Sequence, residues 1–189
     1  MHLGDLYVIK SGLVVSRKKV SDKNNSKFTY KQLNLRSINK GAYIDKYELE
    51  ELKTDEIISD EYLTNEGDIV IRLTDPYTAV YITDEMKGLV ITSNFAVIRG
   101  NANFSKEYLT FYLNSEYVRK MLYSNMQGSI VKSISILAIE NIDLPNILEE
   151  VQSKYAILLK LLQKRKQIIQ NLYQSHDSLM KSIINKSLK

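Results

Sequence analysis

The chain has 189 residues, of which 44% are hydrophobic and 25% charged, with a formal net charge of +4 and no cysteine. This composition is typical of a globular protein with a buried core and excludes a disordered chain. The lack of cysteine excludes disulfides, thiolate metal sites and cysteine nucleophiles. No apolar run approaches the roughly 18 residues that span a bilayer, and the N-terminus lacks a signal-peptide pattern, so we expect a cytoplasmic protein without a membrane partner.

Charge is unevenly distributed along the chain. Residues 10–40 hold nine Lys and Arg against one acid, a net of +8, whereas residues 45–68 hold ten Asp and Glu against two Lys, a net of −8. Such a domain has a basic edge suited to phosphates and an acidic edge suited to basic protein. The alternative is two solvated faces with no binding role.

The first 145 residues predict an α+β domain built from short elements, without the regular alternation of strand and helix that marks a parallel sheet. The polar stretch 21–26 predicts an exposed loop. Ser105 is a suitable N-cap for a helix that carries Leu109 and Leu113, and a second helix is expected to begin near Ser115. The expected strands are Leu6–Ile9, Gly12–Ser16, Asp68–Leu73, Val80–Thr83 and Phe95–Arg99.

Pro145 marks the predicted boundary between a domain of residues 1–145 and a long helix in residues 146–189, because proline fits a connector but not a helix interior. From 148 to 186 such a helix is about 58 Å long. It is too long to be covered by the preceding domain, so we expect it to project and pair with a partner. The alternative is a helix packed back on its own domain. Apolar residues at alternating spacings of three and four form the predicted dimerisation stripe, interrupted only by Arg165 and His176: Leu148, Val151, Tyr155, Leu158, Leu162, Ile169, Leu172, His176, Leu179 and Ile183.

Three partial motifs for enzymatic chemistry are weak. Asp75-Pro76-Tyr77 resembles the Asp-Pro-Pro-Tyr loop of amino-methyltransferases but lacks the second proline. Asp45 with Glu51-Leu52-Lys53 resembles a nuclease pattern that short acidic stretches produce by chance. With His2 at the terminus and His176 inside the stripe, histidine catalysis and a metal site are not expected. We therefore expect no catalytic residues, no metal and no enzyme.

The order of several short segments resembles the specificity subunits of type I restriction-modification systems, specifically a half subunit with one target-recognition domain. Each segment is unspecific alone, but their order and spacing cover almost the whole chain. The helix start departs from the family, which usually has a further proline and a Glu-Gln pair there. The segments are Leu3–Leu6, Gly67–Ile71, Ser93–Ile98, Tyr108–Leu113, Gln127–Ile134 and Ile142–Pro145, followed by the long helix.

The resemblance implies a non-catalytic protein that reads one half of a split site in double-stranded DNA. It implies two methyltransferase subunits, which would bind S-adenosylmethionine, and a motor-nuclease subunit as partners, while this chain itself holds no cofactor. With one recognition domain, the chain is expected to form a homodimer or to pair with a second specificity half. The predicted DNA contacts are Arg17, Lys18, Lys19, Lys23, Lys27, Arg72, Arg99, Gln127, Gly128, Ser129 and Lys132.

The sequence also allows other interpretations of the function of this chain. The chain can be a coiled-coil scaffold or regulator whose globular head binds protein in place of DNA. It can also be a fragment of a longer specificity polypeptide. An independent nuclease or methyltransferase is the least supported of these alternatives.

Overall fold

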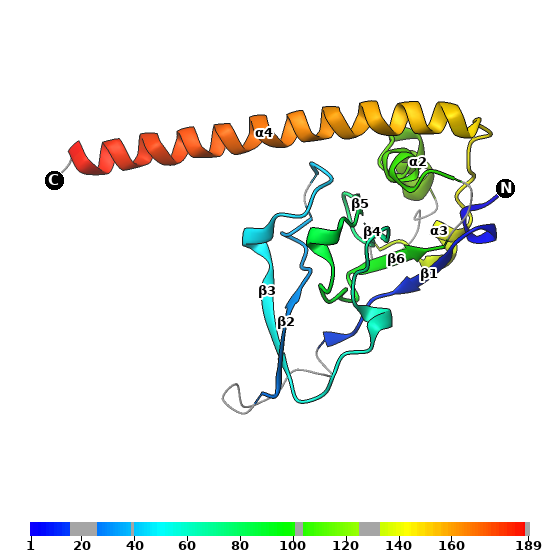
Figure 1. The fold of residues 1–189 in the computed structure, drawn as a ribbon, viewed down its shortest axis with the longest axis horizontal. Coiled ribbons are helices and arrows are strands. Elements are labelled where there is room, and N and C mark those ends of the chain that lie inside the picture. The colour runs from blue at the N-terminus through cyan, green and yellow to red at the C-terminus, as the bar shows by residue number, and fades with distance from the viewer. Residues whose placement is uncertain (16–25, 39, 101–103, 125–132, 188–189) are drawn as a thin grey trace.

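A computed structural model describes residues 1–15, 26–38, 40–100, 104–124 and 133–187. Its centre is a four-stranded antiparallel sheet in the order β1-β6-β4-β5, and a separate two-stranded sheet pairs β2 with β3 (Figure 1). The strands are β1 (Val8–Ser11), β2 (Phe28–Gln32), β3 (Glu50–Thr54), β4 (Ile69–Arg72), β5 (Ala79–Tyr81) and β6 (Phe95–Arg99).

The four α-helices come after β6, the last strand in the chain. Ser105 caps α1, since its hydroxyl accepts a hydrogen bond from the backbone N–H of Tyr108 at 3.2 Å. No helix in the described ranges has the length and apolar character needed to cross a membrane. The α-helices are α1 (Lys106–Leu113), α2 (Glu116–Ser124), α3 (Ile136–Glu140) and α4 (Glu149–Ser187), and the 3-10 helices are η1 (Leu3–Asp5), η3 (Lys46–Glu48), η4 (Asp60–Tyr62) and η5 (Asp84–Met86).

Several sequence-based expectations differ from the observed elements. Strand β6 has the predicted bounds, and β4, β5, α1, α2 and α4 lie where expected within a few residues. The strand predicted over Gly12–Ser16 is wrong for its described part, because Leu13 forms only an isolated bridge to Thr92. Strands β2 and β3 and helix α3 were not predicted. Each of these strands has few apolar residues, and Leu52 is the one apolar residue of β3, so the alternation on which strand prediction depends is very short.

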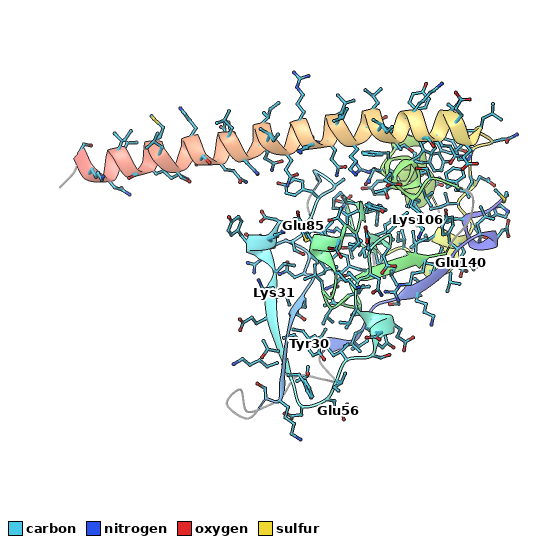
Figure 2. The ribbon with its side chains drawn as sticks, in the orientation of Figure 1. Tyr30, Lys31, Glu56, Glu85, Lys106 and Glu140 are labelled. Atoms are coloured by element: carbon cyan, nitrogen blue, oxygen red, sulfur yellow. The ribbon has the colours of Figure 1, made fainter. Side chains whose placement is uncertain are left out.

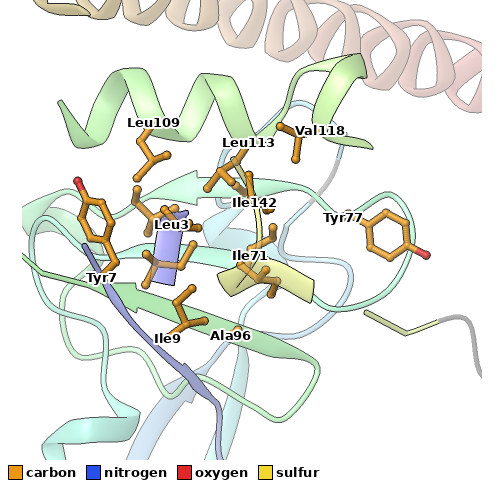
Figure 3. Close-up of a cluster of buried hydrophobic side chains, with 14 of the residues drawn as sticks. Leu3, Tyr7, Ile9, Ile71, Tyr77, Ala96, Leu109, Leu113, Val118 and Ile142 are labelled. Atoms are coloured by element: carbon orange, nitrogen blue, oxygen red, sulfur yellow. The ribbon is translucent and has the colours of Figure 1, made fainter. Parts of the chain in front are cut away.

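The two inner strands of the central sheet, β4 and β6, are buried on both faces. Along β4, Ile69 and Ile71 join a core beneath the α-helices, whereas Val70 joins a second core on the opposite face. Figure 3 shows the helical side, where Leu109 and Leu113 of α1 belong to the same core as Ile71 and Ile142. Burial on both faces explains why the strand is a continuous apolar run and does not alternate.

The basic and acidic stretches fold against each other. In the β2–β3 pair, Lys31 lies opposite Glu51, and the Arg36 guanidinium contacts the carboxylates of Glu48 at 3.3 Å and Glu50 at 3.1 Å. The expectation that the two stretches form separate edges is therefore wrong for the described residues. Cross-strand attraction between opposite charges favours this pairing over two repelling single-sign surfaces.

Gly12 is held against backbone in a way that excludes a side chain. A Cβ atom there would lie 2.3 Å from the carbonyl oxygen of Thr92 and 2.4 Å from that of Ile91. We expect Gly12→Ala to lower the free energy of unfolding by about 1 to 3 kcal/mol, the usual cost of overpacking, as measured by urea denaturation. The neighbouring exposed change Ser11→Ala should alter it by less than about 0.5 kcal/mol. Equal denaturation midpoints for the two variants would contradict this prediction.

Candidate functional site

Most of the predicted DNA contacts lie outside the described residues, so their positions stay predictions. Lys27 is described and exposed, and it directly precedes β2. Arg72 and Arg99 are also described, at the ends of β4 and β6. The predicted contacts outside the described ranges are Arg17, Lys18, Lys19, Lys23, Gln127, Gly128, Ser129 and Lys132.

All three guanidinium nitrogens of Arg99 donate to protein oxygens. Nε and Nη2 bond the carboxylate of Asp68, at 3.0 and 2.8 Å, and the side chain of Asp68 is only 7% exposed. Nη1 donates to the carbonyl of Glu61 and Nη2 to that of Leu63. Arg99 therefore joins β6 to the segment before β4, and most of its hydrogen-bonding capacity is used within the domain. A DNA contact by Arg99 stays a prediction that this geometry does not favour.

Arg72 has a similar internal role. Its Nη1 donates to the carbonyls of Leu35 and Ile38, both at 2.9 Å, and its Nη2 donates to the carbonyl of Asp75 at 2.9 Å. Burial lowers the pKa of the guanidinium, and the charge of Asp75 raises it again. These bonds tie β4 to two loops, which also argues against Arg72 as a free base-reading side chain.

The Asp75-Pro76-Tyr77 segment is a turn that holds α2 on the sheet. Tyr77 is 1% exposed within the core, and its ring packs edge-on against Tyr123 of α2, with 5.1 Å between centroids. The Tyr123 hydroxyl donates to the Asp75 carboxylate. That hydrogen bond, together with burial, raises the pKa of Tyr123 to about 12. The methyltransferase-like residues thus have structural contacts that explain their presence.

Asp45 of the nuclease-like pattern has a structural contact that explains its presence. The Asp45 carboxylate accepts a hydrogen bond from the backbone N–H of Tyr47 at 3.0 Å and so caps η3. On β3, Leu52 is buried whereas Glu51 is exposed. Within the described ranges, no group of three or more His, Cys, Asp or Glu side chains is placed to hold a metal ion. That the chain is not an enzyme remains a prediction.

The β2–β3 hairpin adds a surface that the sequence analysis did not single out. Tyr30 and Leu52 are register partners, and both belong to the small cluster behind the hairpin. Thr29 and Lys31 alternate with the inward residues of β2 and are exposed, and Figure 2 labels Lys31. Their register partners Lys53 and Glu51 lie on the same outward face, which therefore carries both signs of charge. The alternation of Phe28 and Tyr30 with Thr29 and Lys31 is the sequence signal that could have revealed this surface.

The dimerisation stripe of α4 is uncovered in the single chain. Its side chains are exposed, from 49% at Leu162 to 78% at Leu148, except that Val151 is half-buried. The first part of α4 contacts the domain mainly through a neighbouring face, on which Gln152 and Ala156 are buried, and the stripe residue Tyr155 packs against Tyr108 of α1. Beyond Gln170 every described residue of α4 is exposed. In Figure 1 the helix crosses the domain and projects past it. The alternative of a helix packed back on its own domain therefore applies to the first part of α4 and not to the residues beyond Gln170.

No profile of a known protein family matches the chain, and no curated protein sequence matches it. Solved structures do match. One is a chain from work on complex assembly and conformational transition of the type I restriction-modification system, with a TM-score of 0.64, 19% identity and 89% of this chain covered. A second is the HsdS subunit from Thermoanaerobacter tengcongensis, with a TM-score of 0.63, 19% identity and 91% covered. A third is the type I S subunit from M. genitalium, with a TM-score of 0.57, 16% identity and 95% covered.

The chain has the specificity-subunit fold. This finding confirms the expected fold class, an α+β domain followed by one long C-terminal helix. The chain covers 43% of the length of each of these three structures, so it spans less than half of each of them. At these identities the likeness establishes the fold alone.

Proposed function

We propose that this chain is the DNA-recognition half of a type I specificity subunit, which dimerises through α4. The observation that carries the proposal is the uncovered apolar stripe from Leu158 to Ile183, on a helix whose buried residues Gln152 and Ala156 lie on a neighbouring face. A stripe of this length in water is favourable only when a second apolar surface covers it. The specificity-subunit fold over nearly the whole chain supports the assignment of the domain to DNA reading.

A homodimer gives the proposed function a simple geometry. Two identical recognition domains related by a two-fold axis would read the two halves of a symmetric split site, and the paired helices would set the distance between them. Methyltransferase subunits that bind S-adenosylmethionine, and through them a motor-nuclease subunit, are the proposed further partners. The chain itself is proposed to be non-catalytic.

The oligomeric state tests this proposal directly. Light scattering should show a dimer of the full chain and a monomer of a chain that ends after Gln170. This truncation removes only the fully exposed part of α4 and keeps the buried Gln152 and Ala156 contacts. A full-length monomer at micromolar concentration would exclude the homodimer and favour pairing with a different specificity half. A dimer with no salt-dependent affinity for duplex DNA would favour the scaffold or regulator alternative.

The basic segment 17–19 is proposed to neutralise DNA phosphates. Replacing Lys18 and Lys19 by Gln should reduce the slope of log affinity against log salt by roughly 0.9 per lost phosphate contact, or about 1.8 for the pair. The slope is measured by fluorescence anisotropy on duplex DNA at salt concentrations from about 50 to about 300 mM. The control is the double change Lys160→Gln and Lys186→Gln, which removes the same charge from exposed positions of α4. An equal slope for the native chain and the Lys18/Lys19 variant would remove this segment from the DNA-binding surface.

A further inference from the structure

The contact between α4 and its own domain uses polar side chains, although apolar ones are abundant on the same helix. Gln152 is 3% exposed, and both ends of its amide are bonded. Its Oε1 accepts from the backbone N–H of Ser105, the N-cap residue of α1, at 2.9 Å, and its Nε2 donates to the carbonyl of Ile147 at 2.8 Å. A buried amide with both ends satisfied accepts one orientation only, since any displacement leaves a polar group unpaired.

A second polar contact lies farther along α4. The Nε2 of Gln163 donates to the carbonyl of Ala42, in a loop that reaches the helix at mid-length (Figure 1). Ala42 has a φ of 59°, in the left-handed region that non-glycine residues rarely adopt. Gln163 therefore bonds a loop whose backbone is already held in an unusual conformation. Eleven residues separate Gln152 from Gln163, which is about 16 Å along the helix axis.

Two separated attachment points fix a direction, whereas one attachment point permits a hinge. We infer that Gln152 and Gln163 are positioning residues that set the angle between α4 and the recognition domain. The exposure of the helix supports this inference, because both glutamines bond within the chain whereas the apolar stripe from Leu158 to Ile183 stays uncovered. Ala156, which is 8% exposed between the two glutamines, allows the helix to approach α1 closely.

If the chain reads DNA as proposed, the angle between α4 and the recognition domain also determines the spacing between the two half-sites. A tilt of about 10° at Gln152 would displace the far end of α4, about 52 Å away, by about 9 Å. That displacement equals the rise of two to three base pairs at about 3.4 Å each. Fixing the angle therefore fixes the spacer length that a dimer accepts between its two half-sites.

Because the chain has no cysteine, a spin-label pair can be introduced cleanly. Lys87→Cys on the domain and Ser178→Cys on α4, outside the stripe, are both exposed. Double electron–electron resonance, with labelled chain diluted in unlabelled chain, should give one narrow distance distribution. Gln152→Met with Gln163→Met keeps side-chain length but removes both amides, and should broaden or shift this distribution by several ångströms. Ser153→Met with Lys164→Met, at adjacent exposed positions, is the matched control and should leave it narrow. An unchanged distribution in the glutamine variant would overturn the inference.

A second readout separates the inference from the proposed function. In selection from random duplex DNA, the native chain should enrich split sites with a single spacer length, and the glutamine variant should enrich several. Enrichment of one and the same spacer by both chains would refute the role of the two glutamines in spacing. Failure of every chain to enrich DNA would refute the proposed DNA reading, while the distance measurement would still decide whether the glutamines fix the helix.

Discussion

Replacing Leu162 by Glu is expected to convert the proposed dimer into a monomer at micromolar concentration. Leu162 lies near the middle of the stripe and is 49% exposed in the single chain, so a dimer would bury it in both copies. Loss of about 2 kcal/mol of apolar burial per copy weakens dimerisation by about 4 kcal/mol, roughly a thousandfold in the dissociation constant. Burial of two new carboxylates adds to this loss. Sedimentation equilibrium measures the change.

The matched control for this substitution is Gln174→Glu. It introduces the same charge into α4 on the side away from the stripe, where Gln174 is exposed. Since Leu and Glu have similar helix propensities, neither variant should reduce the helical circular dichroism of the chain at concentrations where the native chain is also monomeric. Dimers of equal strength in both variants would show that the stripe is not the subunit interface.

Replacing Asp68 by Ala is expected to cause the largest loss of stability of any single charge substitution in the described domain. The change leaves the Arg99 guanidinium, whose side chain is 26% exposed, without its carboxylate partner. It also removes the acceptor for the backbone N–H of Asn65. Breaking a buried ion pair by removing one partner costs about 3 to 5 kcal/mol. Because Arg99 is partly exposed, we expect Asp68→Ala to lower the free energy of unfolding by about 3 kcal/mol. Urea denaturation followed by circular dichroism measures it.

An exposed ion pair in the same domain provides the comparison. Lys10 contacts Glu61 at 3.2 Å, with side chains 55% and 45% exposed. Lys10→Ala should therefore reduce the free energy of unfolding by less than about 1 kcal/mol. If Asp68→Ala cost no more than Lys10→Ala, the internal role assigned to Arg99 would be wrong, and Arg99 would return as a candidate for DNA contact.

The sequence alone predicts those features that depend on residues close to each other in the chain. The apolar stripe from Leu148 to Ile183 repeats every three and four residues, so the long helix and its exposed face follow from local periodicity. Strand β6 and the cap at Ser105 follow in the same way from a short apolar run and one hydroxyl. The order of these segments was sufficient for the resemblance that the fold comparison confirms.

Other features depend on partners far apart in the sequence, and only the tertiary structure decides them. Arg72 and Arg99 looked like free cations at strand ends, but Arg99 meets Asp68 31 residues away and Arg72 meets the carbonyl of Leu35 37 residues away. The basic and acidic stretches looked like opposite edges until β2 paired with β3. Gln163 reaches Ala42 across 121 residues. Local pattern determines what an element is and which of its faces is apolar, but which face meets which neighbour is decided by packing and by the need to pair every buried polar group.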